Sequence, residues 1–281
     1  MKTLRVGRRD QHGFTLVELL VTLAILGLVM GAALTVYMTG DTIGQTGQNK
    51  AEAQQAARAA MLIEEELRLA GYGFPPAQAR FTAASPTDMT FWADLLDTST
   101  TLSANAASGN TTLNVESAAG VAVGDAIYLI NGDQYTNPSL TVTSVNVATK
   151  KIGVQTGPLA ASCPQEAVLG YCFPRGAQVG RPKQIRYSWN AATQTLSKDA
   201  GDGQGLQPLA TGVQAFQLTY FDATDLCLNG TLPNCTPPLV PVPAANLANI
   251  RRIQITVTAQ SAAARNRGTF TMTSSVRPRN L

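Results

Sequence analysis

The residues from Gly13 to Glu18 bring together a small residue, a change from basic to apolar sequence, and a single carboxylate. Four basic residues precede Gly13, and Glu18 is the only charged residue between Phe14 and Met38. As a helix, that apolar run is long enough to cross roughly 30 Å of hydrocarbon. A carboxylate at membrane depth costs about 2.5 kcal/mol or more, so it is a functional candidate that needs a partner. The chemistry to expect here is an ion pair in an apolar environment, beside a small-residue junction open to cleavage.

Two simpler interpretations explain part of this pattern. A secretory signal peptide also has a basic start, but its small-residue cleavage site follows the apolar stretch. Here Gly13 precedes that stretch, so cleavage would retain the membrane segment. A plain membrane anchor would account for the basic flank as a positive-inside signal, but it leaves Glu18 unexplained.

The Gly13-Phe14 junction and Glu18 resemble the processing site of type IV pilin-like prepilins. The resemblance implies that a prepilin peptidase cleaves after Gly13 and methylates the new amino terminus of Phe14. It also implies that Glu18 pairs with the amino terminus of a neighbouring subunit, where a low dielectric strengthens the attraction. Major pilins usually carry a proline near the position of Thr35, so local melting of the helix is not expected here.

The helix that positions Glu18 continues beyond the apolar run. Within residues 39–74, small and apolar residues recur at steps of three and four, namely Ala56, Ala60, Ile63, Leu67 and Ala70. This spacing predicts one face that packs on a domain, while Glu64, Glu65 and Arg68 face water. Gly71, Gly73 and Pro75 end the pattern, which predicts a rod about 87 Å long from Phe14.

After residue 75 the apolar period changes to two, which predicts a β-rich antiparallel head over residues 75–281. The expected strands are 88–92, 111–115, 126–130, 140–147, 151–154, 184–189, 213–221, 250–258 and 269–276. Segments rich in small polar residues and proline bound a predicted inserted β module at about residues 98–183. The fold class is therefore α+β, with a leader at 1–13, a transmembrane half-helix at 14–38 and an amphipathic half-helix at 39–74.

Several segments resemble PilW-type minor pilins. They are Glu64 to Gly73, Ile185 to Trp189, Leu209 to Phe221, and Ile250 to Thr258. The resemblance implies a minor pilin that primes pilus assembly at the inner membrane and then sits at or near the tip of a surface pilus. Its implied partners are the prepilin peptidase, the assembly platform, and other minor and major pilins bound through the N-terminal helix. The minor J pseudopilin of type II secretion shares this layout, and a tip adhesin or DNA-uptake pilin is a further alternative.

The four cysteines fall into two local groups, Cys163 with Cys172 and Cys227 with Cys235. Three pairings are possible. The pairing that joins Cys163 to Cys172 and Cys227 to Cys235 closes the shortest loops, so we favour it. Zinc is the competing use, but paired C-x-x-C spacing is absent from the sequence and its only histidine is His12.

Net charge gives little reason to expect nucleic acid as a partner. The whole chain is +3, but removal of residues 1–13 leaves 17 of the 21 basic and 17 of the 18 acidic side chains. Arginines near the end of the chain offer a local basic face instead, namely Arg251, Arg252, Arg265, Arg267, Arg277 and Arg279. We expect them to be solvated residues of strands and tails.

Enzymatic chemistry is not expected. A chain cleaved after Gly13 retains no histidine, which excludes Ser-His-Asp and Cys-His arrangements. No cofactor is expected either. Calcium is a further alternative at Asp199, Asp202, Asp222 and Asp225, although Asp beside Gly is first of all turn chemistry.

Overall fold

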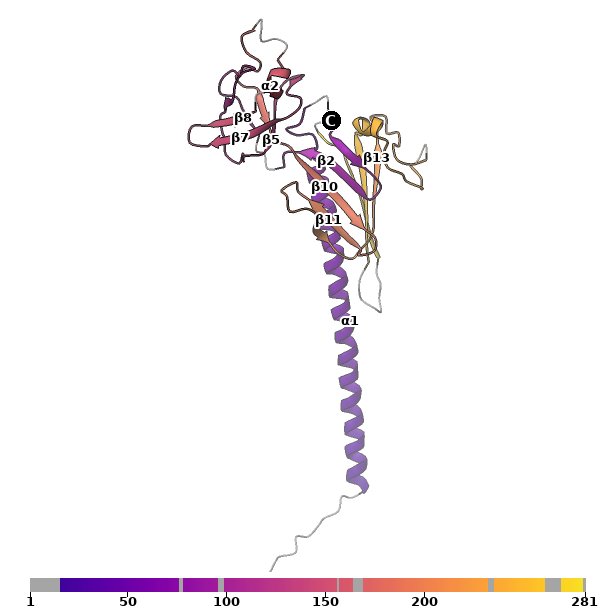
Figure 1. Ribbon diagram of the computed structural model, residues 1–281. Helices are drawn as coiled ribbons and strands as arrows, with labels where there is room; N and C mark the ends of the chain where they lie inside the picture. Colours follow the sequence, from indigo (N-terminus) through magenta and orange to yellow (C-terminus); the bar gives the residue numbers. More distant parts are fainter. Residues whose placement is uncertain are drawn as a thin grey trace, which may run out of the picture.

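The computed structural model describes residues 16–75, 78–95, 99–155, 157–163, 169–231, 235–260 and 269–279 (Figure 1). Within helix α1, the side chains of residues 39–53 are not described. The leader, Gly13 and Phe14 lie outside the described residues. A long helix followed by a β-rich antiparallel head confirms the predicted fold class.

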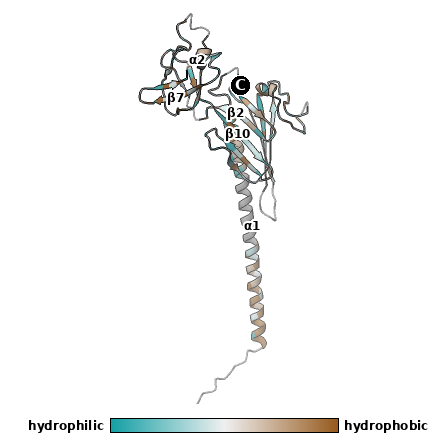
Figure 2. Ribbon diagram, in the orientation of Figure 1, coloured by the Kyte–Doolittle hydropathy of each residue, from teal (hydrophilic) through white to brown (hydrophobic). Residues whose placement is uncertain are grey.

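Helix α1 runs without a break from Leu16 to Arg68, 53 residues in all, or about 80 Å at 1.5 Å per residue. Its first half is apolar and projects away from the head (Figure 2). Its last turns are embedded in the head, where Ala56, Ala60, Ile63 and Leu67 are buried as predicted. The helix ends slightly before Gly71, which takes the left-handed conformation at φ +84° and donates its N–H to Trp92 O at 2.7 Å.

Two antiparallel sheets surround the end of α1. The larger has the order β1-β2-β10-β11-β12 and the smaller has the order β13-β14-β15. The strands are β1 Phe81–Ala84, β2 Asp88–Ala93, β10 Lys183–Asn190, β11 Thr195–Asp199, β12 Gln207–Ala210, β13 Val213–Phe221, β14 Arg252–Gln260 and β15 Thr269–Val276. One hydrophobic core lies between the helix and both sheets, and Tyr187, Phe91 and Tyr220 are its largest buried side chains.

The predicted strand 213–221 coincides with β13, but the longer segment from Leu209 to Phe221, which resembles one strand of PilW-type pilins, is not continuous. Gly212, at φ +70°, divides it into β12 and β13, which belong to different sheets. A positive φ is readily adopted by glycine, so the chain changes direction there. Strands β1, β11 and β12 were not predicted, because their residues lack a sustained apolar alternation.

A second unit, which we call the module, comprises the described residues between 99 and 180. Its strands are β3 Thr100–Thr101, β4 Thr112–Asn114, β5 Ala126–Asn131, β6 Gln134–Tyr135, β7 Leu140–Asn146, β8 Lys151–Val154 and β9 Gln178–Gly180, with a short helix α2 at Gly157–Ala161. They form one antiparallel sheet over a separate hydrophobic cluster that includes Phe173, Ile127 and Leu113. The module lies beside the two sheets, at the end of the head away from the apolar half of α1 (Figure 1).

The module meets the rest of the head at a tight backbone contact. A Cβ atom placed on Gly180 would lie 2.1 Å from Gly73 O, so only glycine fits there. Next to this contact, Phe74 stacks on Trp92 with ring centroids 5.4 Å apart. Phe74 also meets Tyr128 edge to face, again at 5.4 Å. One aromatic side chain therefore contacts both the sheet and the module.

We expect Gly180→Ala to destabilise this junction by about 1–3 kcal/mol, because the added methyl group cannot be accommodated without moving the Gly73 backbone. Trp92 fluorescence during thermal unfolding of the detergent-solubilised protein reports on the change. Gly109→Ala is the control, since a Cβ there meets nothing within 4 Å. Equal melting temperatures for the two variants would contradict the prediction.

Candidate assembly site

The apolar half of α1 is the first element of the site. Leu16–Met38 has a mean hydropathy of 2.5, and none of it is buried within the chain. Leu28, for example, is 77% exposed. A helix of this length and composition can span a membrane and can also pack against similar helices.

Glu18 lies in the first turn of α1 and is exposed. The positive end of the helix dipole is at this terminus, and it favours a carboxylate. The structure therefore places Glu18 on the exposed surface of the apolar half of α1, in its first turn. Its pairing with a neighbouring amino terminus stays a prediction.

Polar groups on this half of the helix are satisfied locally. The hydroxyl of Thr22 donates to Leu19 O at 2.9 Å, and that of Thr35 donates to Gly31 O at 2.7 Å. The helix is unbroken at Thr35, as expected from the absence of proline there. A Cβ placed on Gly27 or Gly31 meets nothing within 4 Å, so these positions leave room for close approach by another helix.

A buried ionic contact joins the other half of α1 to the larger sheet. Glu66 is 8% exposed. Its carboxylate accepts a hydrogen bond from the hydroxyl of Tyr187 and forms an ion pair with Lys198 Nζ at 2.5 Å. Burial and then the charge of Glu66 hold the pKa of Tyr187 well above its usual range, so the phenol remains a donor. The helix is thereby fixed to β10 and β11 by charge as well as by packing.

Sequence reasoning missed Glu66, although the signal for it was present. Glu66 lies three residues after Ile63 and four before Ala70, so it belongs to the face that packs on the head. Glu64 is not simply solvated either, because it pairs with Arg68 and accepts a hydrogen bond from Ser274. Glu65 and Arg68 are exposed as predicted.

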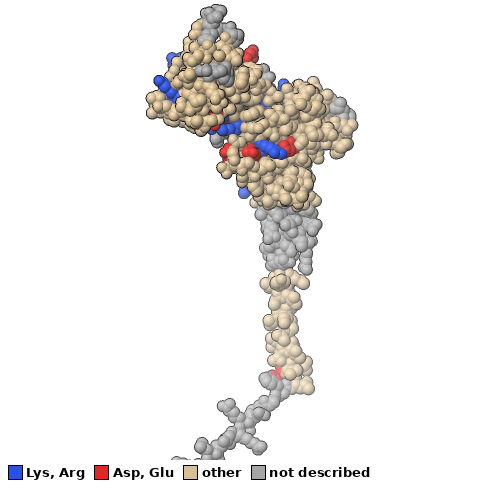
Figure 3. All heavy atoms as spheres, in the orientation of Figure 1, with Lys and Arg blue, Asp and Glu red and all other residues tan. Residues whose placement is uncertain are grey.

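A second ionic contact joins the module to the sheet. Asp125 of the module lies 2.9 Å from both Arg181 Nη1 and Lys183 Nζ, and the side chains of Asp125 and Arg181 are each 9% exposed. Burial acts to raise the pKa of Asp125. Hydrogen bonds from the Ala122 amide and Lys183, with the charges of Arg181 and Lys183, outweigh that effect and lower the pKa below its usual value. Charged residues of both signs gather at this level of the head (Figure 3).

The two ionic contacts line one cleft between the module and the larger sheet. It has a volume of about 520 Å³, and Glu66, Asp125, Arg181, Lys183 and Lys198 are among its walls. Each of these side chains is already engaged in an ion pair with another one in the cleft. The ion pair that holds α1 against the larger sheet and the ion pairs that hold the module against it therefore line the same cleft.

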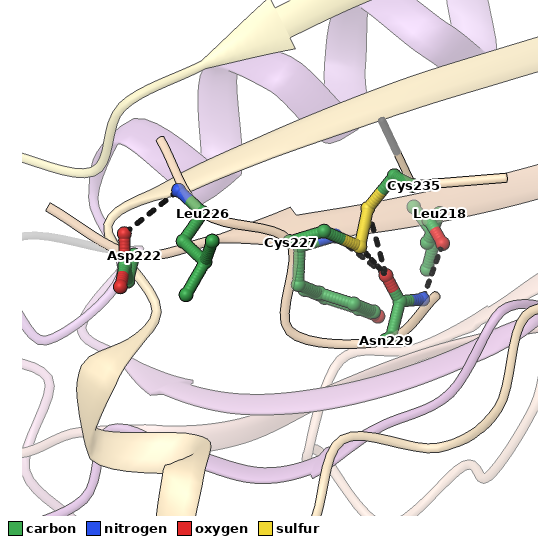
Figure 4. The surroundings of a disulfide bond; sticks show 7 residues. Leu218, Asp222, Leu226, Cys227, Asn229 and Cys235 are labelled. Atoms are coloured by element: carbon green, nitrogen blue, oxygen red, sulfur yellow. Dashed lines mark hydrogen bonds between the residues drawn. A yellow bond between two sulfur atoms is a disulfide. The ribbon is translucent and has the colours of Figure 1, made fainter. Parts of the chain in front are cut away.

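The structure contains both favoured disulfides, Cys163–Cys172 and Cys227–Cys235. The second closes a loop around the buried side chain of Asn229 (Figure 4). Asn229 Oδ1 accepts from the Tyr220 amide and Nδ2 donates to Leu218 O, both at 3.0 Å. Both sulfur atoms lie about 4 Å from the same Oδ1. The side-chain amide of Asn229 thus makes the hydrogen bonds to β13 that the backbone of a neighbouring strand would make.

The four aspartates considered for calcium lie in turns. Asp199, Asp202 and Asp222 each accept an amide hydrogen bond two residues ahead, from Gly201, Gln204 and Thr224 respectively. Asp225 pairs with Arg252 at 2.7 Å and with Arg277 at 3.2 Å. Within the described residues, no group of three His, Cys, Asp or Glu side chains is arranged to hold a metal.

Three of the arginines near the end of the chain, Arg251, Arg252 and Arg277, have side-chain contacts with other residues, and Arg251 Nη1 donates to Ala248 O at 2.7 Å. Besides its pairing with Asp225, Arg252 lies over the ring of Phe221 at 3.6 Å from the centroid. Arg265 and Arg267 lie outside the described residues. Among the aromatic residues, Tyr187 and Tyr220 are fully buried, and Trp189 packs against the edge of the same core.

Comparison with known proteins bears on the N-terminal segment most directly. Residues 8–34 match the family described as the prokaryotic N-terminal methylation motif. A solved type IV-like pilin from Thermus thermophilus is similar over 82% of this chain and 97% of its own, at 12% identity and a TM-score of 0.30, values too low for any of its features to be transferred. The search of curated proteins finds no match.

The chain thus combines a prokaryotic N-terminal methylation motif with an exposed apolar helix long enough to span a membrane and an antiparallel β head.

Replacing Glu66 tests the junction between helix and sheet. We expect Glu66→Ala to destabilise the head by about 3–5 kcal/mol, because it leaves Lys198 without its counter-ion in a partly buried site. Glu65→Ala, on the exposed face, should change stability by less than about 0.5 kcal/mol. Urea unfolding of the detergent-solubilised protein measures both. The double variant Glu66→Leu/Lys198→Met should recover part of the loss, and no recovery would argue against the ion pair.

The contact at Asp125 predicts a defined pH dependence. Because its pKa is lowered in the folded protein, Asp125 stabilises the junction at pH values above its unfolded pKa of about 3.9. That contribution is lost as the pH falls through the lower folded pKa. We therefore expect the melting temperature of wild type to exceed that of Asp125→Asn by a constant amount at pH 5–8, and the difference to shrink as the pH falls below about 4. A difference at pH 2 as large as that at pH 7 would contradict this.

Proposed function

We propose that this chain is a minor type IV pilin of the PilW type, which primes pilus assembly at the inner membrane and sits at or near the tip of the filament. The observation that carries the proposal is the module. It adds a second hydrophobic core and a third sheet to a head that already has one core and two sheets.

The arrangement of the module supports a low copy number. It stands to one side of the two sheets that surround α1 (Figure 1). In a filament built on closely packed helices, every internal subunit would have to place this lateral bulk between its neighbours. A single copy at the end of the filament meets no such restriction.

In this proposal the prepilin peptidase cleaves after Gly13 and methylates Phe14. The apolar half of α1 then holds the subunit in the membrane until it joins other minor and major pilins at the assembly platform. Glu18 pairs with the amino terminus of a neighbouring subunit. In a low dielectric that attraction is strong, so it sets the axial register between subunits.

Sheared surface filaments test this role. By mass spectrometry we expect mature protein that begins at methylated Phe14, at far lower abundance than the major pilin. Glu18→Ala should keep this amino terminus but fall at least tenfold in the filament fraction, because loss of a buried pairing partner costs more than about 1.4 kcal/mol. Thr22→Ala, on the same helix, is the matched control and should be incorporated normally.

Each outcome discriminates between roles. Normal incorporation of Glu18→Ala would refute the pairing. Processed wild-type protein that stays in the membrane and never enters long filaments would favour a type II secretion pseudopilin. Abundance equal to that of the major pilin would contradict a tip position.

A further inference from the structure

Sheet edges carry unpaired N–H and C=O groups, and natural proteins cover or blunt them to prevent unwanted strand pairing. The two sheets around α1 have four edge strands, β1, β12, β13 and β15. The described residues show how three of these edges are covered or blunted. The fourth is different.

The edges at β1 and β13 are covered by other parts of the chain. At β1, Val242 N donates to Ala84 O at 2.8 Å. Along β13, Leu218 N donates to Pro86 O at 2.7 Å, and Tyr220 exchanges hydrogen bonds with the disulfide loop through Leu228 and Asn229. The edge at β12 is only four residues long and contains Pro208, which cannot donate to another strand.

Strand β15 has none of these protections within the described chain. It is eight residues long, its sequence TFTMTSSV contains no charged residue and no proline, and β14 is its only strand partner. Phe270 is 42% exposed at its start. A long, uncharged edge strand of this kind is a template for another strand.

Hydrogen-bond alternation shows which groups of β15 are available. The backbone groups of Leu218 and Tyr220 make their hydrogen bonds on the side of β13 away from β14. The backbone groups of the alternate residues, Gln217 and Thr219, therefore point towards β14, where their partners are Thr256 and Gln254. Ile255 and Val257 of β14 therefore face β15, where Ser274 and Met272 are their partners. It follows that the backbone groups of the intervening residues point away from β14. These residues, Thr269, Thr271, Thr273 and Ser275, are all exposed.

We propose that β15 is a strand-addition site, and that it pairs with an edge strand in the head of a different pilin subunit. Main-chain hydrogen bonds along an open edge provide the affinity in such contacts. The inference rests on the proposed role in filament assembly, since it requires a neighbour anchored in the same membrane.

The position of β15 favours a neighbour in the filament. Ser274 donates a hydrogen bond to Glu64 of α1, and Arg279 N donates to Arg68 O at 3.1 Å. The open edge therefore lies next to the helix on which assembly depends. From the first contact to the second, the residue number rises both in α1, from 64 to 68, and in the C-terminal segment, from 274 to 279. Strand β15 and helix α1 therefore run in the same direction.

This direction argues against a second copy of the chain as the partner. Antiparallel pairing, the more common kind, of two β15 strands would point the two α1 helices in opposite directions. Two subunits anchored in one membrane cannot adopt that arrangement. The other three edges of a second copy are covered or blunted, as described above. The partner strand should therefore belong to a different pilin and run opposite to its own helix.

Photo-crosslinking in filament-producing cells tests the proposal on the full chain. A benzoylphenylalanine is placed at Thr271 or Thr273, and at Gln217 on the covered edge as the control. A third site, Leu28, reports on packing of the apolar helix. We expect adducts from Thr271 and Thr273 to an extended head segment of a different pilin, identified by peptide mapping, and none from Gln217.

Adducts from Leu28 without any from Thr271 or Thr273 would overturn strand addition while leaving the filament role intact. Adducts to a second copy of this chain would overturn the choice of partner. No pilin adduct from any site would overturn both the inference and the proposed function.

A backbone-specific variant provides the second measurement. Thr273→Pro removes an outward N–H and leaves the backbone hydrogen bonds to β14 in place, whereas Thr273→Val retains that N–H. Both variants lose the hydroxyl contact between Thr273 and Thr256, so it does not distinguish them. In the Thr271 photo-crosslinking experiment, we expect loss of the adduct with Thr273→Pro and its retention with Thr273→Val. Unchanged thermal unfolding establishes that the proline variant is folded. An undiminished adduct in a folded proline variant would overturn the proposal.

Discussion

The packing of the last turns of α1 between two sheets is the contact on which the rest of the molecule depends. Ala56, Ala59 and Ala60 are small enough to let the backbones approach, and Ile63 and Leu67 then fill the core. Glu66 adds a buried charge that only a sheet carrying Lys198 and Tyr187 can satisfy. Because the helix is continuous, this junction fixes the head relative to the apolar half, which must meet lipid and other subunits.

The treatment of sheet edges follows from that arrangement. An open sheet packed against a helix has two edge strands, and the unpaired N–H and C=O groups of each edge must be covered or blunted. The Cys227–Cys235 loop places Asn229 where a neighbouring strand would lie, and the asparagine amide bonds to β13 as a peptide group would. The disulfide thus contributes to edge protection as well as to loop closure. Within the described residues, the edge at β15 differs from the other three in having no such cover.

Much of the fold could be predicted from the sequence, and the reasons differ by region. Between Phe14 and Leu67 the period and polarity of the residues are dictated by membrane and core, so the helix and its buried face were identified from them. Strands with sustained alternation, such as β13 and β14, were identified for the same reason. The split at Gly212, the burial of Glu66 and the contacts of Asp125 depend on partners distant in sequence, which no local pattern reports. The pairing of Cys163 with Cys172 was accessible because short loops close most readily.

The place where the module joins the head explains how the fold accommodates it. Strands β2 and β10 are direct neighbours, with Ala93 opposite Lys183, so the module occupies the position of a loop between two paired strands. An insertion at such a place leaves the core between helix and sheets unchanged, and it needs only a rigid connection at its base. Gly73 against Gly180, Phe74 between Trp92 and Tyr128, and Asp125 between Arg181 and Lys183 provide that connection. The same base borders the cleft lined by Glu66 and Lys198, so the attachment of the module lies next to the ion pair between α1 and the larger sheet.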